Sequence, residues 1–162
     1  FLVRRIGKRL LIGKIVETEA YVGFRDRASH ASRGQTKRNA VMFGPPGVAY
    51  VYLVYGMYCC LNIVTSRQGY PAAVLIRAIE PVHSRDLRVA AGPGKVCRYY
   101  KINRQLNGAS VTGRQIWVEN RGVRVARREI ARATRIGVDY AGPYRKKLWR
   151  YYLKSSPAVL QR

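Results

Sequence analysis

The stretch 50–62 limits the possible folds of this chain more than any other. It reads YVYLVYGMYCCLN, so aromatic and aliphatic side chains alternate on both sides of Gly56. Alternation with a period of two is typical of β-strands, and a glycine between two such runs predicts a β-hairpin. Tyrosine is favoured where one end of a ring is buried and the other end is wet. The pattern therefore predicts a hairpin that presents phenol groups to a site or to a surface.

Other segments repeat the strand pattern. Strands are expected at 1–6, 9–23, 71–82 and 148–154, with the middle hairpin between them. Residues 24–39 are polar and aperiodic, which predicts a long functional loop with a helical turn. Short helices are expected within 92–102 and 127–137. These segments predict an α/β (α+β) fold: one domain, 1–162, with a curved, mainly antiparallel sheet.

Basic residues dominate the charge of the chain. There are 31 Lys and Arg against 8 Asp and Glu, which gives a formal net charge of +23. Such a surface favours polyanionic partners, and the spread of the charges along the chain indicates a folded nucleic-acid binder. A merely solvated basic surface, or a ribosome- or membrane-associated protein, is the alternative. No run of about 18 apolar residues occurs, so no membrane partner is expected.

The cysteines indicate the compartment. There are three, Cys59, Cys60 and Cys97, and no C-x-x-C pair. We expect a reduced, intracellular protein without a zinc site or other metal, and without a cofactor. The chain opens on Phe1 rather than Met, so some N-terminal residues are expected to be missing.

Few side chains could carry out acid–base chemistry. Glu17, Glu19 and Tyr21 share one face of a strand, and His30 follows in the polar loop. Two carboxylates on one strand face fit either an exposed polar face or a site. A cysteine–histidine hydrolase using Cys59 or Cys60 is conceivable, although a cysteine within an apolar strand is ordinarily inert.

The hairpin tip, with Tyr55 and Met57, has the shape of an apolar wedge that could enter a DNA base step. Tyr21, His30 and Tyr52 could then hold a displaced base between their rings. A tyrosine-rich strand that packs on the sheet, without any ligand, is the alternative.

Several motifs together resemble the alkyladenine/3-methyladenine DNA glycosylase family. They are VETEAYVG, D-x-ASHAS-x-G-x-T-x-RN-x-x-MF, PG-x-x-YVYLVYGMYCCLN and VLIRAIEP. The similarity is almost continuous over 14–82 and resumes in GPGKVCRYYKIN, RIGVDYAG and LWRYYLKSSP. The chain departs from the family in its short connection 83–91 and its short N-terminal lead-in.

The resemblance implies a single domain with a protruding, DNA-inserting hairpin and a hydrolysis that leaves an abasic site. It implies that Glu19 is the general base, and that Arg77 and the main-chain carbonyl of Leu153 hold the attacking water. It assigns Tyr21, His30 and Tyr52 to the base pocket, and gives further residues these roles: Asn62 in rejecting normal guanine, and Tyr55 and Met57 in intercalation.

The implied partner is double-stranded DNA that contains damaged purines. Basic residues of the polar loop and of the 92–102 segment are candidates for phosphate contacts: Arg33, Lys37, Arg38 and Lys95. A monomer is expected, in the bacterial cytoplasm or nucleoid or in the eukaryotic nucleus. A non-catalytic nucleic-acid-binding module is the main alternative function; it would leave Glu19 without a role.

Overall fold

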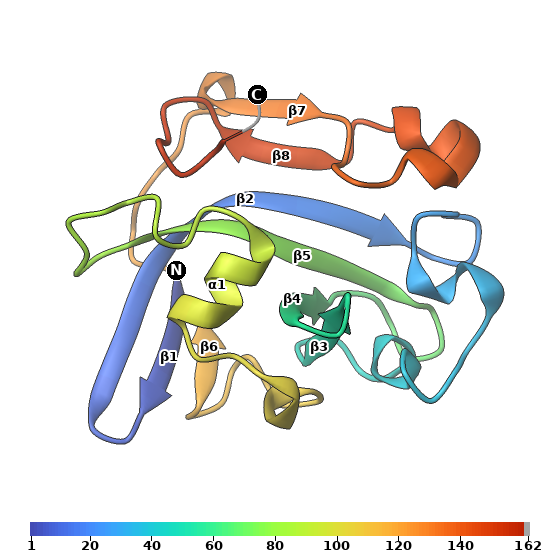
Figure 1. Ribbon diagram of the computed structural model, residues 1–162, viewed down its shortest axis with the longest axis horizontal. Coiled ribbons are helices and arrows are strands. Elements are labelled where there is room, and N and C mark those ends of the chain that lie inside the picture. The colour runs from blue at the N-terminus through green and yellow to red at the C-terminus, as the bar shows by residue number, and fades with distance from the viewer. Residues whose placement is uncertain (161–162) are drawn as a thin grey trace.

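The long strand β2, Arg9–Val22, organises the fold. One of its edges pairs with β5, Ala72–Pro81. Its other edge pairs first with β1, Leu2–Ile6, and then with β8, Arg150–Leu153. Because β2 changes partner along its length, the sheet curls, and Figure 1 shows β1 beside the lower-left part of β2 and β8 beside its upper part.

The computed structural model describes residues 1–160, and its strands form one antiparallel sheet in the order β3-β4-β5-β2-β1-β6, with β8 joining β2 to β7. The tyrosine hairpin is β3–β4, as predicted. The remaining elements, all short, are β3 Ala49–Val54, β4 Tyr58–Val64, β6 Ile116–Val118, β7 Ile130–Ala133, α1 Pro93–Tyr99 and the 3-10 turns His30–Arg33, Ala40–Phe43, Arg104–Leu106, Arg127–Glu129 and Asp139–Lys146.

The main core lies between the sheet and α1 (Figure 1). Val96 and Cys97 of α1 are buried against Leu61 of β4 and Ile76 and Ile79 of β5. Pro93 occupies the first turn of the helix, where its missing N–H costs nothing. This packing closes one face of the sheet and fixes β4 and β5, which carry two walls of the site described below.

The β2–β5 ladder is irregular around Glu17. Its register shifts between Ile15 and Glu17 and again between Glu17 and Thr18, so Val16 on β2 and Arg77 on β5 have no Cα partner. A bulge of this kind turns side chains away from the regular alternation. The irregularity falls where Glu17 and Arg77 meet.

The predicted fold class is confirmed, and so are the helix at 92–102 and the helical turn in the 24–39 loop. The prediction of a helix within 127–137 is wrong. Those residues form one 3-10 turn and then β7, which pairs along β8. The strand conformation depends on pairing with β8, about 20 positions later in the chain. Local propensity does not predict such pairing.

Candidate active site

The tyrosine hairpin forms one wall of a cavity. Tyr50 is 1% exposed, and its hydroxyl lies 3.0 Å from Nδ1 of His30. The His30 ring also meets the Tyr52 ring edge-on, with 4.4 Å between centroids. These contacts fasten the 24–39 loop to β3, because one polar and one aromatic interaction fix the same imidazole. Burial, with a smaller effect of Arg38, lowers the pKa of His30 and favours its neutral form.

The cavity has a volume of about 370 Å³, within the range of small-molecule sites. Segments that are far apart in the sequence line it: the end of β2, the 24–39 loop, the β3–β4 hairpin, β5 and residues 136–140. Of the predicted residues, the lining includes Tyr21, His30, Tyr52, Asn62, Tyr55 and Arg77. The structure therefore brings the expected pocket residues together.

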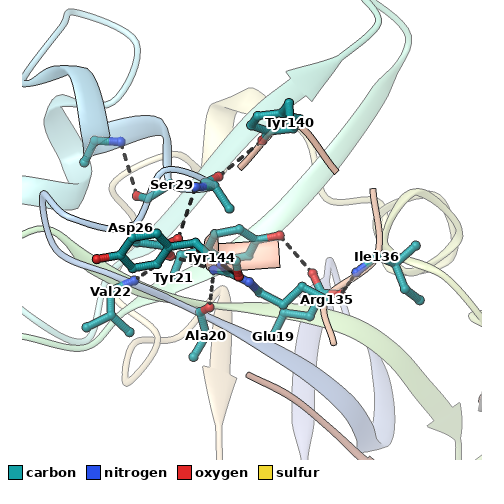
Figure 2. Close-up of polar contacts among 12 residues, drawn as sticks. Glu19, Ala20, Tyr21, Val22, Asp26, Ser29, Arg135, Ile136, Tyr140 and Tyr144 are labelled. Atoms are coloured by element: carbon teal, nitrogen blue, oxygen red, sulfur yellow. Dashed lines mark hydrogen bonds and ion pairs between the residues drawn. The ribbon is translucent and has the colours of Figure 1, made fainter. Parts of the chain in front are cut away.

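Glu19 lies directly behind the cavity wall, with no exposed surface. Its Oε2 accepts a 2.8 Å hydrogen bond from the Tyr21 hydroxyl, and its Oε1 accepts one of 2.8 Å from the Ile136 N–H (Figure 2). Nη1 of Arg77 lies 3.3 Å from the same Oε1. All three partners line the cavity, so the carboxylate is held as an acceptor at its edge. Burial, and then Glu19 itself, raises the pKa of Tyr21, which keeps this phenol a donor.

Glu17 is buried as well, at 4% exposure. Its Oε1 accepts a 2.8 Å hydrogen bond from Nη1 of Arg150 and lies 3.3 Å from Nε of Arg77. The alternative of an exposed polar face for the two glutamates is therefore wrong. Neighbouring strands supply a guanidinium to each carboxylate, and this makes their burial tolerable.

An ion pair that the sequence analysis missed supports the same region. Asp26 and Arg135 have fully buried side chains and make two bonds, of 2.6 and 2.8 Å. Arg135 also donates to the Ala20 carbonyl at 2.9 Å, and its guanidinium lies 4.7 Å from the centroid of the Tyr21 ring. Figure 2 shows the pair beside Glu19. Because Arg135 precedes Ile136, the pair fixes the segment whose N–H binds the Glu19 carboxylate.

Asn62, on β4, also lines the cavity. It is 3% exposed, and its Nδ2 donates to the Tyr50 carbonyl at 3.4 Å across the β3–β4 hairpin. This bond fixes the amide beside Leu75 of β5, which pairs with Asn62 and also lines the cavity.

Leu153 is not brought to this cavity. In the antiparallel β2–β8 pair Glu19 lies opposite Arg150 and Glu17 lies opposite Tyr152, so Leu153 falls beyond Glu17, toward the start of β2. Its carbonyl accepts the Ser156 N–H at 3.2 Å, and its side chain borders another hollow. The resemblance correctly placed Leu153 on this strand. The register of the β2–β8 pair, however, places it outside the site.

The hairpin tip is solvent-exposed, as a wedge requires. Tyr55 is 88% exposed and Met57 is 70% exposed. Tyr55 and Gly56 both have positive φ, of 51° and 70°, and the Met57 N–H closes the turn on the Val54 carbonyl at 3.1 Å. Tyrosine is disfavoured in the left-handed region, so the tip is held in a strained conformation.

A basic groove of about 930 Å³ adjoins the cavity and shares Ser29, His30, Arg38 and Tyr140 with it. Its lining includes the arginines 25, 27, 33 and 38. Arg38 is anchored: it donates to the Leu53 carbonyl at 2.8 Å and lies 5.5 Å from the centroid of Tyr52. Lys37 on the loop and Lys95 on α1 are both exposed.

Other chemistries find less support. Within residues 1–160 no group of three or more His, Cys, Asp or Glu could hold a metal ion. Cys60 lines the cavity, but burial raises the pKa of its thiol to about 11, which keeps it protonated and unreactive near neutral pH. The same described residues include no helix that is long and apolar enough to cross a membrane.

Sequence reasoning from the residues did not find Ile136 or the Asp26–Arg135 pair. A main-chain N–H leaves no mark in a sequence, and the two ion-pair partners are 109 positions apart. Two of the motifs contained a signal, because RIGVDYAG includes Arg135 and Ile136 and D-x-ASHAS begins with Asp26.

Two buried carboxylates lie at an aromatic cavity, and the chain around them is strongly basic. Together these features indicate an enzyme that processes nucleic acid. The profile of the family described as methylpurine-DNA glycosylase (MPG) matches residues 1–157. A protein of Methanocella arvoryzae named "Putative 3-methyladenine DNA glycosylase" is 49% identical over 174 residues, which cover 99% of this chain and 86% of the relative. Proteins of the same name from an Anaeromyxobacter species and from Carboxydothermus hydrogenoformans are 46% and 47% identical, over 98% of this chain and 80% and 87% of their own lengths.

The chain belongs to the methylpurine-DNA glycosylase family. It is therefore an enzyme of DNA repair, a DNA glycosylase of the 3-methyladenine type whose substrate is DNA. The alternative of a non-catalytic nucleic-acid-binding module is set aside.

Proposed function

We propose that this glycosylase turns alkylated or deaminated purines out of duplex DNA into the aromatic cavity and hydrolyses their N-glycosidic bond with water. The class of lesions comprises 3-methyladenine, 7-methylguanine, hypoxanthine and ethenoadenine. One observation carries the proposal: the Glu19 carboxylate is held by three cavity-lining donors at the edge of a pocket walled by Tyr21 and Tyr52.

Glu19 has two roles in this scheme. As the bond between the base and C1′ breaks, its electron pair leaves with the base and the sugar becomes oxocarbenium-like. The carboxylate stabilises that positive charge and takes a proton from water, whose oxygen bonds to C1′. The products are a free base and an abasic site. Water attack makes the enzyme monofunctional, without strand cleavage through a Schiff base.

Arg77 is proposed to help hold the attacking water. Its guanidinium lines the cavity, and its Nη1 is 3.3 Å from the Glu19 carboxylate. A water molecule bound between the two would be oriented and activated together. The Leu153 carbonyl has no part in this proposal, because the β2–β8 register places Leu153 beyond Glu17 and the residue does not line the cavity.

Aromatic walls account for a preference for alkylated purines. A 7-methylguanine base is cationic, and a cation over a tyrosine face gains about 0.5–2 kcal/mol. Tyr21 and Tyr52 provide such faces, with His30 edge-on to Tyr52. We propose that Asn62, fixed by its bond to the Tyr50 carbonyl, crowds the 2-amino group of normal guanine. A cationic base also departs readily, so it needs no acid.

DNA binding is proposed to combine a wedge with a basic surface. Tyr55, with Met57 beside it, would fill the gap left by the everted nucleotide. Phosphates would meet the exposed basic residues around the cavity mouth: Arg33, Lys37, Arg38 and Lys95. We further expect a monomer that works inside the cell on chromosomal DNA.

The test compares Glu19→Gln with wild type in single-turnover excision from a duplex that contains one hypoxanthine or 7-methylguanine. Free base and alkali-labile sites are measured, and binding of the same duplex is measured separately. We expect excision to fall by at least about a hundredfold, with binding retained. Glu80→Gln is a matched control, because Glu80 pairs with Lys14 at 2.9 Å on the same two strands. Excision by Glu19→Gln at the wild-type rate would refute the assignment.

A further inference from the structure

Glu17 connects two of the three groups that hold Glu19, Arg77 and the Ile136 segment. Its Oε1 lies 3.3 Å from Nε of Arg77, and the Nη1 of that arginine contacts Glu19. The same Oε1 accepts a 2.8 Å hydrogen bond from Arg150, and the Nε of Arg150 donates to the Thr134 carbonyl at 3.0 Å. Thr134 is two residues before Ile136, the main-chain donor to Glu19. One buried oxygen thus joins two of the three supports of the catalytic carboxylate.

The backbone is shaped for this contact. Arg77 is the residue that the β2–β5 register skips, next to the shift at Glu17. A regular ladder would give Arg77 a Cα partner and a fixed side of the sheet, whereas the bulge lets its guanidinium reach both glutamates. The Arg77 carbonyl accepts the Gly92 N–H at 3.0 Å, so the bulged residue keeps a backbone partner.

These contacts link two glutamates with two arginines, and the four charges balance. Glu17 and Glu19 together offset Arg77 and Arg150, all of them buried or nearly so. Without the Glu17 charge, two guanidiniums would face one carboxylate. That excess positive charge would oppose a cationic sugar and would draw Arg77 more tightly onto Glu19, which weakens Glu19 as a base.

We propose that Glu17 is a positioning residue for the excision reaction. It binds the Arg77 guanidinium, which then interacts with two carboxylates instead of one, and it binds Arg150, which contacts the 134–136 segment. Both contacts keep Glu19 oriented and its negative charge available to the sugar. The inference rests on the proposed function, because it acts through Glu19. It adds a residue that touches neither the base nor the water.

The experiment measures the pH dependence of single-turnover excision of 7-methylguanine from duplex DNA. This base is already cationic, so its departure needs no proton, and the acid limb of the profile responds to the charge around the catalytic carboxylate. The titratable and charged groups around Glu19 are Glu17 and Tyr21 on β2, Cys60 on β4, Arg77 on β5, Arg135 and, through Glu17, Arg150 on β8. His30 also lines the cavity, and its lowered pKa is common to all the variants.

Opposite shifts are expected from two variants. Glu17→Gln leaves net positive charge, so excision falls by about tenfold or more and the acid limb moves to lower pH. Arg150→Gln leaves net negative charge, so the acid limb moves to higher pH. Glu17→Asp keeps the charge and recovers most of the rate, and Glu80→Gln on the same strand pair matches wild type. Thermal unfolding is recorded for each variant.

Loss of rate in both variants without opposite shifts of the acid limb would show a merely structural role and overturn the inference. Wild-type excision by Glu17→Gln would also overturn it. If Glu17→Gln does not fold, the Arg150→Gln profile decides: an unmoved acid limb refutes the inference. The Glu19→Gln result tests the proposed function separately. If Glu19→Gln is inactive and Glu17→Gln excises the base at the wild-type rate, only this inference is refuted.

Discussion

Replacing Tyr55 by glycine separates the stability of the hairpin from its role on DNA. Tyr55 is 88% exposed and has φ of 51°, so its ring contributes little to the core while its backbone is strained. A non-glycine residue in the left-handed region costs about 1–2 kcal/mol. Tyr55→Ala keeps this strain and Tyr55→Gly removes it, although both lose the ring. We expect the free energy of unfolding of the glycine variant to exceed that of the alanine variant by about 1 kcal/mol.

Both variants, Tyr55→Ala and Tyr55→Gly, should lose the same amount of affinity for damaged DNA. Stacking between an aromatic ring and a base is worth about 1–3 kcal/mol, so a loss of about 2 kcal/mol weakens binding roughly 30-fold. Binding is measured by fluorescence anisotropy on a duplex that contains a tetrahydrofuran abasic analogue, which cannot be turned over. The same duplex without the lesion is measured at the same salt concentration, and there the loss should be less than about threefold, because phosphate contacts dominate.

Tyr55→Phe is the matched control, since it keeps the ring and the backbone geometry and should bind like wild type. Equal losses on the damaged and undamaged duplexes would refute the wedge. A glycine variant no more stable than the alanine variant would refute the argument from backbone strain.

Other consequences can be checked in the same protein. Asp26→Ala should lower the free energy of unfolding by about 3–5 kcal/mol in urea titrations, because it leaves Arg135 buried without its partner; adding Arg135→Met should recover much of this, and an unrecovered double variant would contradict the reasoning. Lys37→Ala should reduce the slope of log affinity against log salt by about 1, and an unchanged slope would remove Lys37 from the phosphate contacts. Arg38→Gln should raise the pKa of His30 measured by NMR, since one of the two causes that lower this pKa is lost; a fall would contradict the direction. EDTA should leave excision unchanged, and inhibition reversed by Mg²⁺ would show a metal requirement.

Much of the architecture could be predicted from the sequence. The alternating runs on both sides of Gly56 predicted the β3–β4 hairpin, and the Pro and Gly before 95 predicted the start of α1. Period and turn chemistry are local properties, so a single sequence reports them. The motif around Glu19 and Tyr21 placed both on one strand face, which the structure keeps.

Some of the predictions depended on pairing between distant segments and were wrong for that reason. The 127–137 segment has a composition that fits a helix, but β8 offers it a strand edge. Leu153 lies on the expected strand, but antiparallel register moves it past Glu17. Register is fixed by contacts across the sheet, and a shift of a few residues is invisible in local composition.

By itself the sequence determined the strand pattern, the basic surface and the residue types available for chemistry, because periodicity and charge belong to the chain at every point. Tertiary structure alone decided that Glu17 and Glu19 are buried, that Arg77 leaves the ladder to reach both, and that an N–H 117 positions away binds Glu19. Burial and hydrogen bonding depend on which distant segments pack together, and that choice is made by the folded molecule as a whole.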